Sequence, residues 1–500
     1  MPHTSILYQN NDATIFLIDI PTSIALAQSL SKQTPSERHL LSSPALETPY
    51  PPLTEPKTAA ARARVLERTP RSERAVAAAI EPVVLGALAE IRGGFQDRKW
   101  CFERCLVGNK DGDVHEPGSG NSNEGGRSGG VALGKRRRKG EADYQEDDQS
   151  TADGSGIQAS AWEQPAETMT INQPPLILSA GLNRFTSGAE LRNHIVKNTS
   201  PSTATVSLCS QQNSPSNIAA ARGQQNKVKD QNSRYTIPPL STFFICSLPI
   251  SSPLKKKNKH NPIPGLGPNQ EFNLILLDPP WSNRSVRRSG HYQMQSYSHF
   301  DLLTKWVCDV LRVHSFSAPP SPALDGGEGK VASGREDSSR PDTCVAAIWI
   351  TNSAKARRTA YDSLTRAGFT VTEEWVWIKT TLYGEPVTPV EGLWRKPYEV
   401  LVVGVKKENE EKEGEEGTAR GIRRRVIAGV PDVHSRKPNL REVFERVFFS
   451  SSSSSAGAGA ARMRYEALEV FARNLTAGWW ACGDEVLKFN DGEWWADGDA

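Results

Sequence analysis

Short apolar runs recur through the second half of the chain, and each is long enough for a strand that is buried on both faces of a parallel sheet. They predict strands at residues 274–277, 345–350, 398–405, 426–430, 468–472 and 485–489. Residues 370–379 alternate apolar and polar side chains, which predicts a further strand. Residues 237–246 are expected to form the strand that enters this region.

Between these runs, apolar side chains spaced three and four residues apart predict amphipathic helices. They lie at residues 300–313, 354–367 and 440–447, and Gly368 is placed to end the second helix. Strands and helices therefore alternate. We expect an α/β fold built on a doubly wound, Rossmann-like sheet, with ligands beyond the carboxyl ends of its strands.

The first half of the chain is expected to be less ordered. A strand at residues 13–20 and a short helix at 24–30 open the chain, and helical spacing returns within 71–106. Gly, Ser, Asn, Gln and charged residues then dominate, which is typical of disorder. The predicted organisation is a partly ordered N-terminal region at 1–106, a mostly disordered linker at 107–234, a folded domain at 235–490 and a tail at 491–500.

The composition agrees with long segments outside the core. Of 500 residues, 37% are hydrophobic and the mean hydropathy is -0.51, so much of the chain cannot bury a core. Segments at 315–341, 406–417 and 450–460 are expected to be long disordered insertions. No run approaches the roughly 18–20 apolar residues that a membrane span needs. We expect a soluble intracellular protein without membrane contact.

Charge and cysteine add two expectations. The net charge of +3 is too small to indicate nucleic acid by itself, but residues 135–139 and 255–259 are compact basic runs. The first is typical of a nuclear-import signal or a phosphate contact, or else of a solvated linker. We expect a nuclear protein, or one shared between nucleus and cytoplasm. The seven cysteines lack zinc-site spacing, which predicts no metal, and they suit a reducing compartment.

The strand at 274–277 runs directly into Asp278-Pro279-Pro280-Trp281. This arrangement suits methylation of an exocyclic amine on a nucleobase, a poor nucleophile that must be oriented. The Asp278 carboxylate and the Pro279 carbonyl oxygen can each accept one N–H of the amine. The prolines keep the backbone rigid, and Trp281 offers a flat face to a flipped base. The alternative is a proline-rich turn with one aromatic residue.

Polar residues also follow other predicted strands. A methyl donor such as S-adenosylmethionine presents a carboxylate, which suits Lys437, and a ribose diol, which suits Asp484 or Glu485. Taken singly, such residues are often solvated or belong to turns. Their joint position at the strand ends of one sheet favours a donor site.

Several ordered motifs carry a family resemblance. They are Asp278-Pro-Pro-Trp281, Trp349-Ile-Thr-Asn352, Trp375-Val-Trp-Ile-Lys379, Lys396-Pro-Tyr-Glu399, Val433-His-Ser-Arg-Lys-Pro438 and Phe471-Ala-Arg-Asn-Leu-Thr-Ala-Gly-Trp479. Together they resemble the MT-A70 family of adenine-N6 methyltransferases, and within it the branch of methyltransferase-like protein four. The resemblance covers residues 235–490.

The resemblance implies a sheet of permuted (class beta) methyltransferase order, in which the catalytic tetrapeptide precedes much of the donor site. It implies that Asp278, Pro279, Pro280 and Trp281 hold the target amine. The implied donor site consists of Ile245 and Cys246 at the adenine, Asp278, Lys437 at the carboxylate or the target base, and Arg473, Asn474, Asp484 and Glu485 around the ribose. Asp484 departs from the Asn common in the family, but its carboxylate also accepts from a diol.

Two loops, at residues 282–297 and 431–439, are implied to close over the base. The implied base contacts are Asn283 and Tyr292 from the first loop, His434 from the second, and Trp377 and Glu399 from strands. The methyl group passes directly to the amine, with no covalent intermediate and no metal.

The function that this implies is S-adenosylmethionine-dependent methylation of adenine N6 in RNA, with 2′-O-methyladenosine of a small nuclear RNA as the target. Adenine in DNA is the alternative substrate. A non-catalytic RNA-binding scaffold is the alternative of another class, but such a subunit is expected to lose Asp278 or Trp281. Methylation of a glutamine or another amide fits the aromatic pocket less well. A need for a partner subunit is left open.

Overall fold

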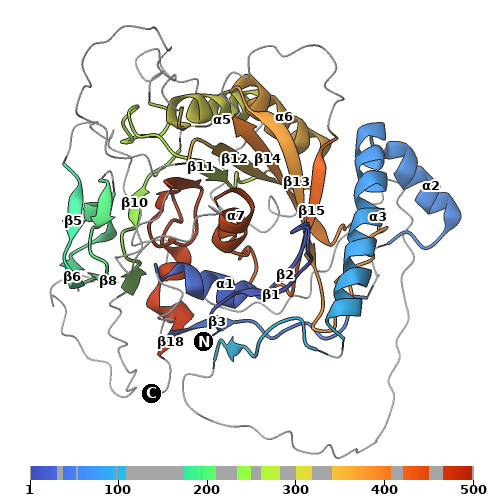
Figure 1. The fold of residues 1–500 in the computed structure, drawn as a ribbon, viewed down its shortest axis with the longest axis horizontal. Helices are drawn as coiled ribbons and strands as arrows, with labels where there is room; N and C mark the ends of the chain where they lie inside the picture. The colour runs from blue at the N-terminus through green and yellow to red at the C-terminus, as the bar shows by residue number, and fades with distance from the viewer. Residues whose placement is uncertain are drawn as a thin grey trace, which may run out of the picture.

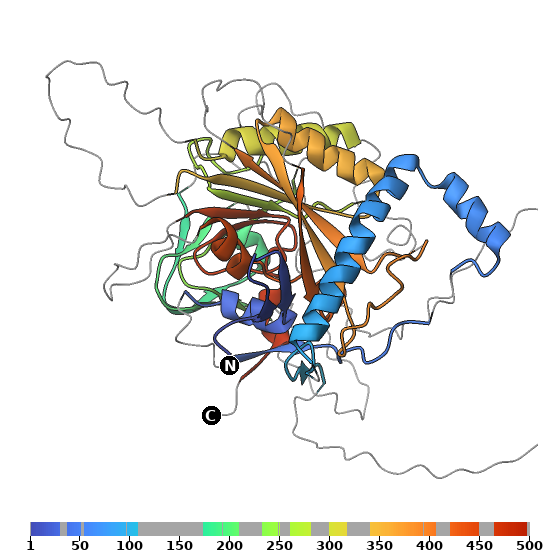
Figure 2. The same cartoon turned by 45° about the vertical axis from the view of Figure 1, so that its right-hand side comes forward.

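A computed structural model of the chain describes residues 2–30, 38–51, 55–96, 98–108, 174–192, 194–209, 233–248, 250, 261–281, 300–317, 341–393, 395–406, 421–449 and 465–497. They fold around a 12-stranded mixed sheet with helices on both faces (Figures 1 and 2). The predicted α/β fold is confirmed. In the described part of the chain, no helix is long and apolar enough to cross a membrane.

The strands of the large sheet lie in the order β1-β2-β15-β13-β14-β12-β11-β16-β17-β10-β7-β5. Their bounds are β1 Ile6–Gln9, β2 Ile15–Ile18, β5 Leu176–Leu178, β7 Val196–Asn198, β10 Thr242–Ile245, β11 Leu274–Leu277, β12 Cys344–Ile350, β13 Thr370–Lys379, β14 Tyr398–Lys406, β15 Arg423–Gly429, β16 Ala467–Val470 and β17 Trp480–Gly483. Strand β14 is antiparallel to both β12 and β13, while β11 is parallel to β12 and β16. The carboxyl ends of β11, β12, β13 and β16 therefore share one edge of the sheet.

Strand β11 marks the point where the strand order reverses. β12, β14 and β13 lie on one side of it, while β16 and β17, which come late in the chain, lie on the other. The Asp278 N–H donates to the Val470 carbonyl at 3.2 Å, so the ends of β11 and β16 are held together. In open α/β sheets, ligands bind outside the carboxyl ends of strands at such a point. The late position of β16 and β17 agrees with the predicted permuted order.

Helices cover the two faces of the sheet. Their bounds are α1 Ile20–Ala27, α2 Ala59–Arg68, α3 Arg71–Gly94, α5 Phe300–His314, α6 Ala354–Arg366 and α7 Arg441–Phe448. Apolar side chains of α3, α5 and α6 pack into one cluster with one face of the sheet, and those of α1 and α7 pack into a second cluster with the other. In Figure 1, α5 and α6 lie across the top and α3 runs along the right flank. Helix α6 ends at the predicted place, with Gly368 at φ +87°.

The N-terminal region is part of the large sheet. Strand β2 pairs in parallel with β15, and β1 pairs with β2. The predicted helix at 24–30 is shifted: α1 begins at Ile20, because the Asp19 carboxylate accepts the Thr22 N–H at 3.0 Å and Pro21 fits the first turn. Sequence analysis missed β1 and α2.

The prediction of a mostly disordered linker at 107–234 is wrong for its described part. Strands β5 and β7 extend the large sheet beyond β10. Three further strands, β6 Gly181–Phe185, β8 Ala204–Leu208 and β9 Ser233–Ile237, form a small sheet. Their few apolar residues become a core only when they meet β10, so composition along the chain did not reveal them. Residues 109–173 and 210–232 lie outside the described residues.

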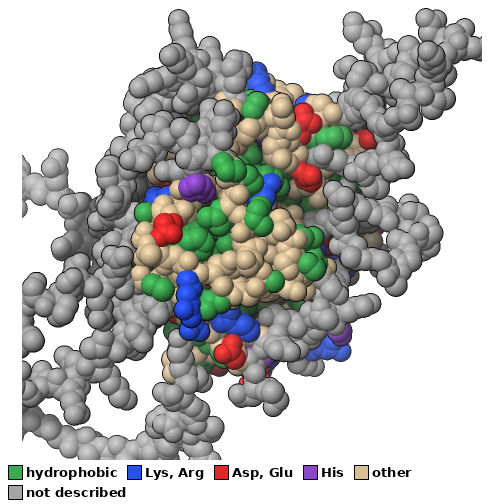
Figure 3. Space-filling model, turned by 90° about the vertical axis from the view of Figure 1, so that its left-hand side faces the viewer, with side chains coloured by type: hydrophobic (Ala, Val, Ile, Leu, Met, Phe, Trp, Pro, Cys, Tyr) green, Lys and Arg blue, Asp and Glu red, His purple; other side chains and the backbone are tan. Residues whose placement is uncertain are grey.

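Figure 3 views the molecule from the side of these added strands, where hydrophobic side chains stand among polar ones. Ile177 of β5 is 53% exposed and Leu182 of β6 is 49% exposed. Apolar side chains of these added strands are therefore partly exposed on this side of the molecule.

Two other predicted strands are corrected. Residues 237–246 form two strands in different sheets, because Pro238 and Pro239 interrupt the backbone pairing between β9 and β10. Residues 485–489 form a turn and the start of the 3-10 helix η4 Lys488–Asn490, and β17 occupies the predicted place in the sheet. The remaining elements are η2 Gly188–Leu191, η5 Gly492–Trp494 and a small sheet of β3 Arg38–Ser42, β4 Cys105–Leu106 and β18 Trp495–Asp497. Residues 318–340, 407–420 and 450–464, within or beside the predicted insertions, lie outside the described residues.

A contact between Gly384 and Trp100 tests how firmly the N-terminal region is joined to the domain. Gly384 has φ +81°, and a Cβ there would overlap the buried Trp100 indole. We expect Gly384→Ala to lower the free energy of unfolding by about 2–3 kcal/mol, from backbone strain plus overpacking. Gly368→Ala is the control, because its φ is similar and no atom lies within 4 Å of the added Cβ. Equal losses in chemical denaturation of the two variants would contradict the proposed packing.

Candidate active site

Two lysines and two carboxylates form a chain of ion pairs at the shared edge of the sheet. Lys437 Nζ lies 2.9 Å from both carboxylate oxygens of Asp278 and 3.4 Å from Glu399 Oε2. Lys379 Nζ donates to Glu399 Oε1 at 2.7 Å. Asp278 follows β11, Lys379 ends β13, and Glu399 belongs to β14, so the sheet itself sets these positions. Opposite charges pair throughout, which offsets the cost of partial burial.

The ion pairs shift the pKa values of Glu399 and Lys437 and so determine their protonation states. Burial by itself raises the pKa of the Glu399 carboxyl, but the ammonium groups of Lys437 and Lys379 outweigh it and lower that pKa to about 2. Burial likewise lowers the pKa of Lys437, but Asp278 and Glu399 outweigh it and raise that pKa above its usual value. Both groups therefore stay charged at neutral pH.

Aromatic side chains surround these charges. The Trp281 Nε1–H donates to the Trp349 carbonyl at 2.7 Å, and the Trp281 ring stacks with Phe300 at a centroid distance of 6.3 Å. Trp349 packs edge-on against Trp377 at 6.1 Å, and Lys437 Nζ lies 5.5 Å from the Trp349 ring centroid. The hydrogen bond and the stacking hold Trp281 in one orientation beside Asp278.

The sequence analysis treated the Pro279 carbonyl oxygen as free to accept from the amine. In the structure it already has a partner. It accepts the Trp281 N–H at 2.8 Å, which closes a tight turn within the tetrapeptide. A carbonyl oxygen has two lone pairs, so one remains for a ligand. The turn directs Asp278 and Trp281 to one place.

A cavity opens where β11 and β16 end, against the loop that precedes α7. Asp278, Lys437, Glu469, Arg473 and Asn474 all line it. The structure thus brings together four of the residues predicted for the donor. Within the described ranges, no group of His, Cys, Asp or Glu could hold a metal ion.

The remaining predicted donor residues lie beside this cavity rather than on it. Glu485 accepts from Arg473 Nε at 3.1 Å and from Lys488 Nζ at 2.9 Å. Asp484 accepts from Ser247 Oγ at 3.1 Å. Ile245 and Cys246 are buried where β10 ends, next to β17. They occupy neighbouring strand ends of the same edge.

The predicted base contacts are only partly placed. Glu399 belongs to the chain of ion pairs, Trp377 is buried beneath Lys379, and His434 is exposed in the loop that carries Lys437. Asn283 and Tyr292 lie outside the described residues, as does most of their loop.

Comparisons with known proteins agree with this site. Residues 337–485 match the MT-A70 family, a segment that includes Glu399, Lys437 and Arg473. MTA1 of Cryphonectria parasitica, named an N6-methyladenosine RNA methyltransferase, is 36% identical over 229 residues, which are 45% of this chain and 55% of the relative.

Over residues 337–485 the chain is similar to the MT-A70 family.

MTA1 of Pyricularia oryzae is 32% identical over 275 residues, 52% of this chain and 57% of the relative. Human METTL4, named an N(6)-adenine-specific methyltransferase, is 29% identical over 269 residues, 51% of this chain and 44% of the relative. The second match supports the predicted branch of the MT-A70 family. The chain spans about half the length of the curated relatives it matches.

Glu469 is a residue of the candidate site that sequence analysis missed. It lies on β16 opposite Leu276 of β11, partly buried, and lines the cavity with Asp278. Burial, helped by the Asp278 charge, raises the pKa of its carboxyl to about 8. The available signal was one acidic residue inside the otherwise apolar strand Ala467–Val470.

The Glu469 carboxyl should make stability depend on pH. Its pKa rises from 4.5 to about 8 on folding, so the folded protein binds the proton more tightly than the unfolded chain. The resulting stability is present at acid pH and is lost as pH rises from 4.5 through 8. Glu469→Gln should remove this fall and leave the variant more stable than the wild type at pH 8, by about 1 kcal/mol or more.

The measurement is urea denaturation at several pH values across that range. The control is Glu391→Gln, which changes an exposed carboxylate and should keep the wild-type pH profile. Parallel profiles for Glu469→Gln and wild type would show that Glu469 is charged at neutral pH.

Proposed function

We propose that this protein is an S-adenosylmethionine-dependent methyltransferase that acts on adenine N6 in RNA. The observation that carries the proposal is the placement of Asp278. Its carboxylate stands at the point where the strand order reverses and is paired with Lys437. The match of residues 337–485 to the MT-A70 family, and the names of the relatives, support the same reaction class.

The residues around Asp278 can orient an adenine amine. One N–H would donate to the Asp278 carboxylate and the other to the remaining lone pair of the Pro279 carbonyl, which directs the nitrogen lone pair away from both. Phe300 covers one side of Trp281, so a flipped base would stack on the opposite face. As the nitrogen gains a methyl group it must lose a proton, and Asp278 is placed to accept it.

The polar groups of the cavity fit the amino-acid part of S-adenosylmethionine, which when bound would supply the electrophilic methyl group. Lys437, Arg473 and Asn474 can donate to its carboxylate, while Asp278 and Glu469 can accept from its ammonium. Both signs of charge therefore meet in one cavity. That complementarity supports the donor that the sequence implied.

Lys437 can change partners during the reaction. It holds both carboxylate oxygens of Asp278, and each oxygen keeps a second lone pair that can accept an N–H of the amine. A donor carboxylate in the cavity would compete for the Lys437 ammonium and release Asp278. We infer that donor binding prepares the site for the base.

For the substrate, we propose RNA, and within it 2′-O-methyladenosine of a small nuclear RNA, with a nuclear location. The fungal relatives are named RNA methyltransferases, which supports RNA, whereas the name of human METTL4 specifies no nucleic acid. Adenine in DNA is the alternative. The intact pairing of Asp278 with Lys437 beside Trp281 argues against a non-catalytic scaffold.

The test is methyl transfer from labelled donor to matched oligonucleotides. They are RNA with adenosine, the same RNA with 2′-O-methyladenosine, and single- and double-stranded DNA of the same sequence. Preference for the 2′-O-methylated RNA is the expected result. Preference for DNA would show that DNA, the alternative, is the substrate. Donor binding without transfer to any oligonucleotide would contradict the proposed methyltransferase activity or reveal a need for a partner subunit.

A further inference from the structure

Arginines gather on residues 57–74, a segment made of α2 and the first turn of α3, which we call the arginine arm. Its six basic residues are Lys57, Arg62, Arg64, Arg68, Arg71 and Arg74, and its two acidic residues are Glu67 and Glu73. The resulting net charge of +4 (6 minus 2) exceeds the +3 of the whole chain. Positive charge is therefore concentrated here among the described residues.

The arginine arm does little to hold the fold together. Helix α2 buries no residue, and the six basic side chains of the arm are exposed. Among the described residues, Arg64, Arg68, Arg71 and Arg74 make no ion pair, and the guanidinium of Arg62 donates only to the Pro56 carbonyl at 3.0 Å. Selection for stability alone does not account for so many unpaired arginines.

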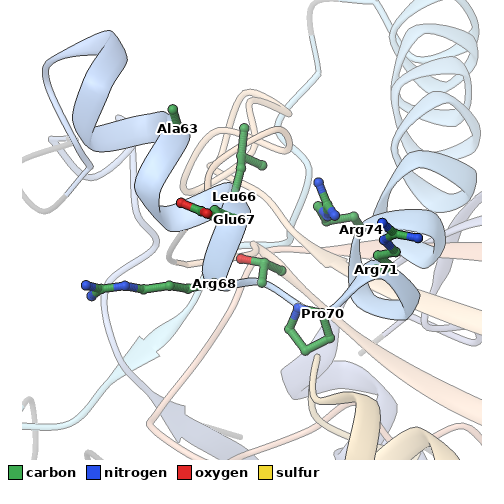
Figure 4. A pocket seen from close by; sticks show the side chains of 8 residues that line it. Ala63, Leu66, Glu67, Arg68, Pro70, Arg71 and Arg74 are labelled. Carbon is green, nitrogen blue, oxygen red and sulfur yellow. The ribbon is translucent and has the colours of Figure 1, made fainter.

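The arm encloses a hollow between its two helices. Figure 4 shows Arg68 on one side of the hollow and Arg71 and Arg74 on the other. Leu66, which is 39% exposed, and Pro70 offer apolar surface between the charges, and the lining also includes Ala63, Thr69 and one carboxylate, that of Glu67. Guanidinium groups around an apolar floor suit a sugar-phosphate backbone, since arginine pairs with phosphate through two N–H groups at once.

The last residues of the arm contact the beginning of α6. Glu73 Oε1 accepts the Ala354 N–H at 2.8 Å, so the first turn of α3 is fastened to the beginning of α6, as Figures 1 and 2 also show. One residue further, Lys355 Nζ lies 5.8 Å from the ring centroid of Phe300, which stacks on Trp281. The first two residues of α6 therefore connect the arm, through Ala354, with Phe300, through Lys355.

We propose that the arginine arm and Lys355 bind the sugar-phosphate backbone of the nucleic acid that flanks the methylated base. The proposal rests on the proposed function for its substrate class, and it adds the surface that holds the strand while one base enters the site. Phosphate contacts of this kind carry affinity and position the strand without reading its sequence.

The test compares two matched double variants by fluorescence anisotropy. Arg71→Gln with Arg74→Gln removes two charges of the arm. Arg184→Gln with Arg423→Gln removes two exposed charges elsewhere, on β6 and at the first residue of β15. Each is titrated with a long single-stranded RNA and with a trinucleotide centred on the target adenosine, at several salt concentrations.

We expect the arm variant to bind the long RNA about tenfold more weakly in moderate salt. Its salt slope should shrink by about 0.7 for each phosphate that the arm no longer neutralises. The trinucleotide should bind both variants alike, because it does not reach the arm. The control variant should match the wild type on the long RNA.

Unchanged affinity and salt slope for the arm variant would overturn the inference. So would an equal loss on the trinucleotide, which would indicate general damage to the site. Binding is measured without turnover, so the result remains readable if methyl transfer fails. If the protein methylates adenine and the arm variant binds RNA as the wild type does, the proposed function stands and this inference is refuted.

Discussion

Asp278→Ala is expected to lower the rate of methyl transfer by about 10³-fold or more, because one carboxylate both orients the amine and takes its proton. Donor affinity should stay within about tenfold, since Lys437, Arg473 and Asn474 still line the cavity. The measurement is single-turnover transfer to RNA, with donor binding followed by calorimetry. Asp278→Asn tests the same point with the side-chain volume kept, because the amide accepts an N–H but carries no charge.

The matched control is Asp362→Ala on the outer face of α6, where the carboxylate pairs only with neighbouring arginines of the same helix. It should transfer methyl groups at the wild-type rate. Wild-type turnover in Asp278→Ala, with the fold intact, would remove Asp278 from the reaction and with it the observation on which the proposed function rests.

Lys437→Met is expected to weaken donor binding by about 100-fold, because the cavity loses the cation best placed for a carboxylate and keeps its acidic groups. The variant should also be less stable by about 2 kcal/mol or more at neutral pH, because Asp278 and Glu399 lose a shared partner. Calorimetric titration with donor measures the first effect, and urea denaturation measures the second.

The stability loss has a defined pH dependence. The folded-state pKa of Glu399 is lowered from 4.5 to about 2, so its ion pairs contribute stability above pH 4.5 and lose it as the pH falls toward 2. The difference between wild type and Lys437→Met should therefore be largest at neutral pH and shrink in acid. Lys406→Met is the control for both measurements, because among the described residues its ammonium donates only to Ser315 and Ser317. Equal donor affinity in Lys437→Met and wild type would assign the lysine to the ion pairs alone.

Much of the domain could be predicted because its signals are local. The run Leu274–Leu277 is apolar throughout, and the predicted bounds of the strand Thr370–Lys379 matched the observed bounds. Amphipathic spacing located α5 and α6 within a residue or two. The tetrapeptide was found because its residue types are rare together at the end of an apolar run. Lys437 was found as a basic residue in the loop that follows the predicted strand 426–430.

The elements that were missed depend on partners far away in the chain. Strands β5 and β7 are three residues each; β7 pairs with β10, and β5 pairs with β7. In sheets, packing against cross-strand neighbours outweighs the intrinsic β-propensity of a residue. Short polar strands are therefore hard to predict from sequence alone.

The same distinction between local and long-range information applies to the candidate site. The sequence by itself determined which chemical groups stand at the strand ends: Asp278, Trp281, Glu399, Lys437 and Arg473. Only the tertiary structure decided that Lys437 bridges Asp278 and Glu399, that Glu469 lines the same cavity, and that the arginine arm contacts the beginning of α6. The physical reason is that residue type and local pattern are written along the chain, whereas electrostatic pairing and burial depend on distances that folding sets between remote segments.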